Sequence, residues 1–268
     1  MNAMGTGRTT QVLAGVGLLF LLLPLAVVVL ASFGATDYVA FPPQGWSLHA
    51  YADALDHTEF RDSLVLSLQL AVLVAVVSTA LGTLAALGLR ILRTRAALRL
   101  EALFLAPLAV PHLVLGVAIL QVIGLLGLGV SLPVLVAGHL VICLPYATRL
   151  VIAALATIDP NAERAAAVLG ASPWYVVRHV TLPHARPAIV ASLFITATVS
   201  FDDVGIALFL ANADTQTLPV RIFHYVEYHF APFIAALGAV LIVVPVVAAV
   251  AVERWFGLGR LFGLTTRR

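Results

Sequence analysis

Residues 163–189 read ERAAAVLGASPWYVVRHVTLPHARPAI, a stretch rich in small and cationic residues that lies between two long apolar segments. Just before it, Asp159-Pro160 is typical of an N-cap followed by the first residue of a helix. Gly170 is typical of a helix C-terminus, and Ser172-Pro173 repeats the cap-and-proline start. The pattern therefore predicts two short helices joined at a glycine.

The two predicted helices differ in the surfaces that they offer. The first carries Ala165, Ala166 and Ala167, whose small side chains allow another backbone to approach closely. The second has Trp174, Val177 and Val180 on one apolar face, and we expect Leu182-Pro183 to end it. Such a pair can dock on another protein or rest on lipid headgroups, and these physical features alone leave both interpretations open.

The composition is that of a multi-pass membrane protein. Hydrophobic residues occupy 62% of the 268 positions and charged residues 10%, compared with about 45–50% and about 25% in soluble domains. The single cysteine, Cys143, lies in an apolar run, which excludes a disulfide framework and a thiolate metal cluster. All 15 basic side chains are arginines. Without lysine the chain has no Walker-type Gly-Lys loop for ATP.

Six segments are long and apolar enough to span about 30 Å of hydrocarbon. They are predicted at residues 12–33, 64–89, 102–128, 132–155, 188–210 and 234–252. The first resembles a cleaved signal peptide in its flanks, but its apolar core exceeds the roughly 7–15 residues of such signals. We therefore expect an all-α polytopic membrane protein with six transmembrane helices, forming a single domain over residues 1–268.

Arginine placement predicts the orientation of these spans, because cytoplasmic loops are enriched in basic residues. Arg61 and Arg221 fall on one side of the membrane, together with seven acidic residues. Thirteen arginines share the other side: Arg8, Arg90, Arg93, Arg95, Arg99, Arg149, Arg164, Arg178, Arg186, Arg254, Arg260, Arg267 and Arg268. Both termini and the loop at about residues 159–187 are therefore predicted to be cytoplasmic.

The spacing within this loop resembles a known family motif. Ala165-Ala166, Gly170 after three residues, and Val180-Thr181-Leu182-Pro183 after nine more are similar to the EAA loop of binding-protein-dependent ABC importer permeases. One position departs from the pattern, since Arg164 stands where the family has Glu and Glu163 lies one place earlier. That departure puts in doubt the salt bridge expected with the ATPase.

The resemblance implies a type I ABC importer permease fold in the bacterial inner membrane, with a cytoplasmic coupling-helix loop. In this family the loop contacts a cytoplasmic ATPase dimer, and ATP and Mg²⁺ bind to that partner, so no cofactor is expected in this chain. The ATPase-coupling residues implied are Glu163, Arg164, Ala165, Ala166, Gly170, Leu182 and Pro183.

Three shorter matches resemble the second permease of spermidine/putrescine-type systems. They are residues 41–48 with Tyr51, residues 200–203 and residues 217–220. The resemblance implies a small cationic, polyamine-like cargo delivered by an external binding protein. It also implies a second permease subunit as a heterodimer, with a homodimer as the alternative, and no nucleic acid. An opine-like amino acid derivative and an aminophosphonate remain alternative cargoes.

Four polar side chains within the spans are candidates for the substrate pathway. Asp202 and Asp203 are too costly to face lipid, so one of them is expected to meet substrate while the other is held by protein. Capping of a broken helix near Gly205 is the structural alternative for either carboxylate. His112 and His139 are the other two candidates, although a lone histidine within a membrane more often makes a helix–helix hydrogen bond than binds substrate.

The sequence predicts no catalytic residue and no metal site. The histidines lack metal-ligand spacing, and no serine has a base that the pattern places beside it. An intramembrane enzyme would need such a constellation. A secondary transporter, the other alternative, would need its own coupling-ion site and often carries an inverted repeat, and neither is found.

Overall fold

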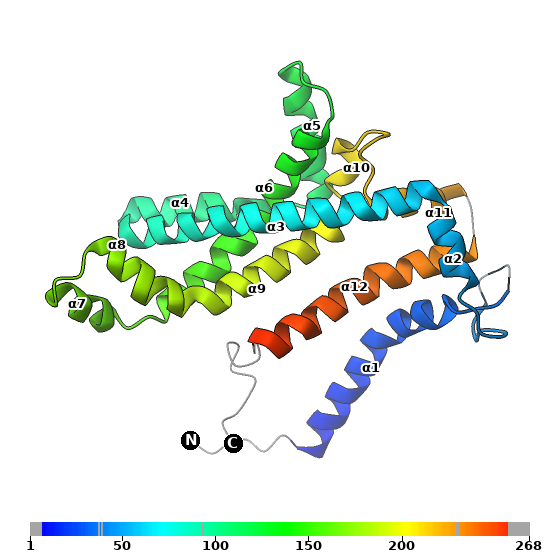
Figure 1. Ribbon diagram of the computed structural model, residues 1–268, viewed down its shortest axis with the longest axis horizontal. Coiled ribbons are helices and arrows are strands. Elements are labelled where there is room, and N and C mark those ends of the chain that lie inside the picture. The colour runs from blue at the N-terminus through cyan, green and yellow to red at the C-terminus, as the bar shows by residue number, and fades with distance from the viewer. Residues whose placement is uncertain (1–6, 37, 39, 93, 229–230, 257–268) are drawn as a thin grey trace. The chain divides into compact units, whose positions relative to one another are not determined.

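The computed structural model describes residues 7–36, 38, 40–92, 94–228 and 231–256 (Figure 1). Within these ranges the regular secondary structure is helical, and a single isolated β-bridge joins Gly34 to Trp46. The helices are α1 (Arg8–Ala31), α2 (His49–Asp56), α3 (Thr58–Leu92), α4 (Arg95–Leu105), η1 (Ala106–Ala109), α5 (His112–Leu125), α6 (Leu132–Ala156), α7 (Pro160–Val168), α8 (Pro173–Val176), η2 (Val177–Thr181), α9 (Leu182–Phe201), α10 (Ala207–Leu210), α11 (Leu218–Tyr228) and α12 (Pro232–Phe256).

Within the described residues, five continuous helical segments are long and apolar enough to cross a membrane. They are residues Thr9–Ala31, Thr58–Leu92, Leu132–Ala156, Pro173–Phe201 and Pro232–Arg254. A sixth span is present if α4–η1 and α5 together form one broken span. These two segments are bent by 106° where they meet. The expected all-helical membrane fold is thus confirmed, with five to six spans.

The predicted span over residues 102–128 falls on two segments, α4–η1 and α5, which are bent by 106° relative to each other. The chain leaves the helical conformation at Val110, which has φ −105° and ψ 130°, and α5 starts after Pro111. A residue before proline is driven towards extended backbone, and the proline itself has no N–H for the preceding turn. The proline at position 111 therefore separates two helices.

The helix that covers most of the predicted span over residues 188–210 differs from it at both ends. The expected helix end at Leu182-Pro183 is absent: a π-helical turn, η2, leads directly into α9, so the helix runs from Pro173 to Phe201. A π-helical stretch is typically a single turn inside a longer helix, as η2 is here. At the other end the helix breaks after Phe201, and residues 202–206 precede the short helix α10.

The described chain divides into two compact units, and the first contains residues up to Arg61 and Ile222–Pro245. Its centre is aromatic. Phe60 is fully buried, and the ring of Phe233 lies 5.3 Å from those of Phe60 and Tyr225 and 4.7 Å from that of His57. The boundaries between the two units fall inside helices α3, α11 and α12. This division does not test the single domain expected over residues 1–268, which stays a prediction.

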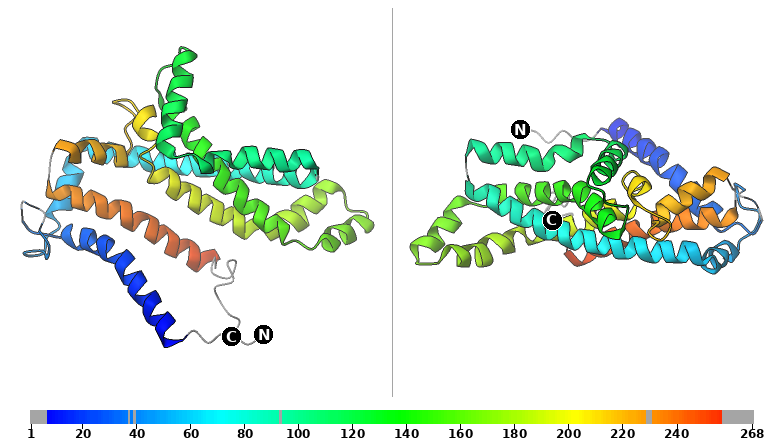
Figure 2. Two further views of the ribbon diagram at one scale, coloured as in Figure 1. Left: turned by 180° about the vertical axis from the view of Figure 1, so that it is seen from behind. Right: turned by 90° about the horizontal axis from the view of Figure 1, so that it is seen from above.

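The second unit, Asp62–Arg221 and Val246 onward, holds the residues considered below. Helices α6 and α9 pack side by side along their lengths (Figures 1 and 2). Gly82 of α3 allows close packing on α6, because a Cβ at this position would lie 2.8 Å from the Cβ of Ala147. The helices α7 and α8 lie beyond the ends of α3, α4 and α6, at the end of this unit opposite α10 (Figures 1 and 2).

Candidate functional site

The predicted pair of short helices is present, and local side-chain caps define both starts. The carboxylate of Asp159 accepts a hydrogen bond from the N–H of Asn161 (2.9 Å), and Pro160 is the first residue of α7. The hydroxyl of Ser172 accepts one from the N–H of Tyr175 (3.2 Å), and Pro173 begins α8. These contacts confirm the predicted cap-and-proline starts. We call residues 159–181 the helical insert.

Gly170 ends α7 in the left-handed conformation that its position predicted, with φ +87°. The N–H of Gly170 donates to the carbonyl of Ala167 (3.0 Å), and that of Ala171 donates to the carbonyl of Ala166 (3.1 Å). This pair of bonds is the Schellman arrangement, which satisfies carbonyls that a helix end leaves free. No atom lies within 4 Å of a Cβ added at Gly170. The conformation of the backbone, and not crowding, therefore requires glycine here.

The outer surface of the helical insert is apolar with flanking arginines. Val168 and Leu169 are each 87% exposed and Trp174 is 68% exposed. Arg164 and Ala165 are also exposed, whereas Ala166 is half-buried. Apolar side chains with this exposure favour contact with another surface. The apolar face predicted for the second helix is divided, because Val177 and Val180 are half-buried.

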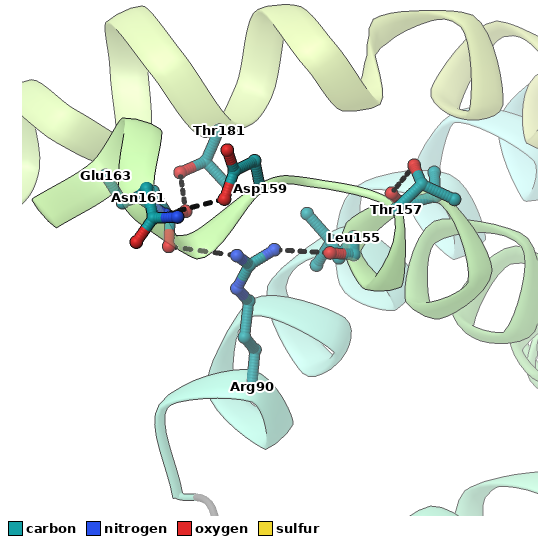
Figure 3. Close-up of polar contacts among 8 residues, drawn as sticks. Arg90, Leu155, Thr157, Asp159, Asn161, Glu163 and Thr181 are labelled. Carbon is teal, nitrogen blue, oxygen red and sulfur yellow. Dashed lines mark hydrogen bonds and ion pairs between the residues drawn. The ribbon is translucent and has the colours of Figure 1, made fainter.

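Glu163 lies on the inner side of the helical insert and has two partners from other elements (Figure 3). Its Oε2 accepts from Nη2 of Arg90 at the end of α3 (2.9 Å), and its Oε1 accepts from the hydroxyl of Thr181 (2.7 Å). Nη1 of the same arginine donates to the carbonyl of Leu155 at the end of α6 (2.6 Å). We call Arg90, Leu155, Glu163 and Thr181 the insert clamp.

The sequence did not reveal this clamp. Arg90 contributed only to the orientation prediction, because a residue 73 positions from Glu163 gives no local signal of pairing. Leu182 and Pro183, from the family motif, follow the clamp residue Thr181 directly and begin α9. They continue the helix out of the insert instead of closing it.

A second polar cluster joins the two helix breaks of this unit. Asp203, which is buried, accepts at Oδ2 from the N–H groups of Ile206 (2.8 Å) and Ala207 (3.2 Å). Its Oδ1 accepts from Nδ1 of His112, the first residue of α5 (2.9 Å). The carboxylate therefore caps the broken end near Gly205, as the structural alternative predicted. The sequence placed His112 and Asp203 among the pathway candidates without pairing them.

The remaining two pathway candidates have different surroundings. Asp202 follows the last residue of α9 and is exposed. His139 of α6 is fully buried and shares a hydrogen bond with Ser200 Oγ of α9 (2.9 Å), while its Nε2 has no hydrogen-bond partner within the described ranges. The sequence pattern placed no base beside a serine, and the packing of α6 on α9 brings His139 to Ser200. Both members of this pair are buried between α6 and α9.

The described residues hold no group of three or more His, Cys, Asp or Glu that suits a metal ion. The two polar clusters instead join helices: one at the ends of α3 and α6, and one at the breaks before α5 and after α9. Together with the long apolar helices, they define a multi-pass helical membrane protein that carries a helical insert.

Comparison with known proteins identifies the family. Residues 78–258 match the family model described as binding-protein-dependent transport system inner membrane component, so the chain belongs to this family. It is the membrane-spanning, non-catalytic permease subunit of an ABC importer, which also contains an ATPase and a binding protein. Membership excludes the intramembrane enzyme and the secondary transporter.

Two relatives of known classification match most of the chain. The spermidine/putrescine transport system permease protein PotC of Haemophilus influenzae is 28% identical over 84% of this chain and 87% of that protein. The putative 2-aminoethylphosphonate transport system permease protein PhnV of Salmonella choleraesuis is 30% identical over 90% and 92%. One solved structure with a similar fold is a bacterial alginate ABC transporter in complex with alginate pentasaccharide-bound periplasmic protein. It superposes with a TM-score of 0.72, and the match is 15% identical and covers 97% of this chain and 96% of that one.

Proposed function

We propose that this chain forms half of the translocation pathway for a small organic cation of the polyamine type. An external binding protein delivers the cargo, and a second, different permease subunit completes the pathway, with a homodimer as the alternative. ATP and Mg²⁺ bind only to the cytoplasmic ATPase dimer. In this proposal both termini and the helical insert face the cytoplasm of a bacterial cell, and Asp202 faces the pathway.

The contrast between the two adjacent carboxylates carries the cargo proposal. Asp203 has its acceptors occupied by two backbone N–H groups and an imidazole, whereas Asp202 is exposed at the same helix break. A carboxylate in the apolar part of a bilayer is costly unless it faces a partner or a wet route. Asp202 is therefore the better candidate for the residue that meets the substrate.

A carboxylate in a pathway with little water favours a cation. Coulombic attraction grows as the effective dielectric constant falls, so one ammonium group gains more here than in bulk water. The names of the two relatives fit this charge, because polyamines and 2-aminoethylphosphonate each carry an ammonium group. An aminophosphonate, together with an opine-like amino acid derivative, is therefore the second candidate cargo.

Uptake into proteoliposomes tests the cargo proposal. The complex is reconstituted with its ATPase, partner permease and binding protein, and supplied with radiolabelled spermidine or radiolabelled 2-aminoethylphosphonate. We expect Asp202→Asn to lower uptake at unchanged complex yield and ATPase activity, and Asp202→Glu to retain more. Normal uptake by Asp202→Asn, or a cargo without any cationic group, would contradict the role of this carboxylate.

The exposed outer surface of the helical insert supports its proposed docking on the ATPase. Ala165 lies on that surface, where a small side chain permits close contact. We expect Ala165→Glu to reduce recovery of the ATPase with the permease, while the adjacent Arg164→Ala, which removes a side chain without adding bulk, has a smaller effect. Equal ATPase recovery with both variants and the parent protein argues against docking through this surface.

A further inference from the structure

The insert clamp connects the helical insert to the ends of α3 and α6 through an ion pair and hydrogen bonds. Arg90 and Glu163 are 19% and 20% exposed, so their ion pair is largely shielded from water. The arginine serves two acceptors on different elements with two different nitrogens, which the single ammonium of a lysine does less well. Through these contacts the ends of α3 and α6 are joined to α7 and η2.

Apolar packing between α3 and the insert is incomplete. A pocket of about 390 Å³ lies between them, with Leu87 and Ile91 lining it from α3 and Ala167, Ala171 and Val177 lining it from the insert. Side chains that border a cavity lack packing partners on that side. The clamp therefore carries a larger share of the connection than it would in a fully packed contact.

From this arrangement we propose that Arg90, Glu163 and Thr181 are positioning residues that transmit movement of the helical insert to α3 and α6. The inference rests on the proposed docking of the insert on the ATPase. Since both oxygens of Glu163 are bonded within the chain, this carboxylate does not serve as the salt-bridge partner of the ATPase. Arg164, Ala165 and the exposed apolar side chains of the insert make that contact instead.

Loss of one clamp residue leaves the others without their charge or hydrogen-bond partner. Glu163→Gln keeps the size of the side chain but removes the charge that pairs with Arg90. Thr181→Val removes the hydroxyl and keeps the shape. Glu101→Gln, on α4 near the same helix ends, is the matched control because it removes a carboxylate outside the clamp.

Hydrogen–deuterium exchange of the purified complex tests this inference without any cargo. Exchange is compared with and without ATP and vanadate for the insert (residues 159–181) and for the ends of α3 and α6 (residues 84–92 and 150–156). In the parent protein and in Glu101→Gln, we expect the nucleotide to change exchange in both regions. In Glu163→Gln and Thr181→Val, we expect the change in the insert to persist and that at the helix ends to fall about threefold.

Two outcomes separate the inference from the docking proposal. If both clamp variants transmit the nucleotide-dependent change to α3 and α6 as fully as the parent, the clamp is not a positioning device, and docking still stands. If nucleotide changes nothing in the insert of the parent complex, docking itself is wrong. Where Glu163→Gln lowers complex yield, Thr181→Val still tests the inference, because it leaves the Arg90–Glu163 ion pair and the bond from Arg90 to the carbonyl of Leu155 in place. Transmission as full as in the parent protein with Thr181→Val then overturns the inference.

Discussion

Nδ1 of His112 lies 2.9 Å from Oδ1 of Asp203, and this contact joins the start of α5 to the break that follows α9. The break between η1 and α5 therefore lies beside the break between α9 and α10. The carbonyl and N–H groups that a break frees must find partners away from lipid, because an unsatisfied backbone group is costly in a bilayer. The carboxylate of Asp203 meets part of this need by accepting from two N–H groups.

We predict that His112→Ala destabilises the purified complex. The variant removes a hydrogen bond to a buried carboxylate, a class of contact that contributes about 1.5–3 kcal/mol. Thermal unfolding of the complex in detergent measures the loss. The exposed His184 provides the control, and His184→Ala should unfold close to the parent temperature. If the two variants unfold at the same temperature, the imidazole of His112 is dispensable for stability.

Asp203→Asn should be more damaging than His112→Ala, since the carboxylate has three donors. An amide oxygen can still accept some of these bonds, but its NH₂ group cannot. We expect a lower yield of folded complex, measured by size-exclusion chromatography after solubilisation. The Asp202→Asn variant should elute with normal yield. If Asp203→Asn reaches the parent yield, the cap is unimportant for folding.

Gly205→Ala tests how closely the two breaks approach. An added Cβ would lie 2.7 Å from the Cβ of His112 and 3.0 Å from the backbone nitrogen of Leu113, neither of which is the flexible end of a side chain. Overpacking of this kind costs about 1–3 kcal/mol. Gly88→Ala in α3 is the control, since no atom lies within 4 Å of its added Cβ. We expect the midpoint temperature of thermal unfolding to fall for Gly205→Ala and not for Gly88→Ala.

Gly170 separates a conformational requirement from a steric one. Its φ of +87° is unfavourable for residues with a Cβ, while the surrounding space is open. Asparagine enters the left-handed region more easily than a β-branched residue. We therefore expect Gly170→Val to weaken recovery of the ATPase while the protein still inserts in the membrane, and Gly170→Asn to be milder. The same recovery for both substitutions would mean that the backbone conformation does not matter for assembly.

The orientation is tested by labelling single cysteines with an impermeant thiol reagent in whole cells lacking Cys143. Cysteines at Arg95 and Ala171 should be protected, and cysteines at Gly45 and Ala213 should be labelled. A third protected position, Thr266, lies outside the described residues. Labelling at Ala171 from outside the cell would place the helical insert on the wrong side for an ATPase.

The sequence alone determined the features whose causes are local. Apolar segments of membrane length indicated a multi-pass helical protein, because a polar backbone in lipid must satisfy its own hydrogen bonds. The caps at Asp159 and Ser172 and the left-handed glycine at position 170 depend on residues within one helical turn, so their pattern was sufficient. The family motif in the same stretch also led to the correct family.

The tertiary structure decided where helices break and which charges meet. Proline alone was ambiguous, since Pro145 and Pro245 lie inside continuous helices whereas a break precedes α5 at Pro111. Asp202 and Asp203 are neighbours of the same type, and only the packing of α5 against the break shows which of them is held. The pairing of Arg90 with Glu163 likewise depends on the meeting of helix ends 73 residues apart in the chain. Contacts of this kind arise from the arrangement of whole helices, which local sequence patterns do not encode.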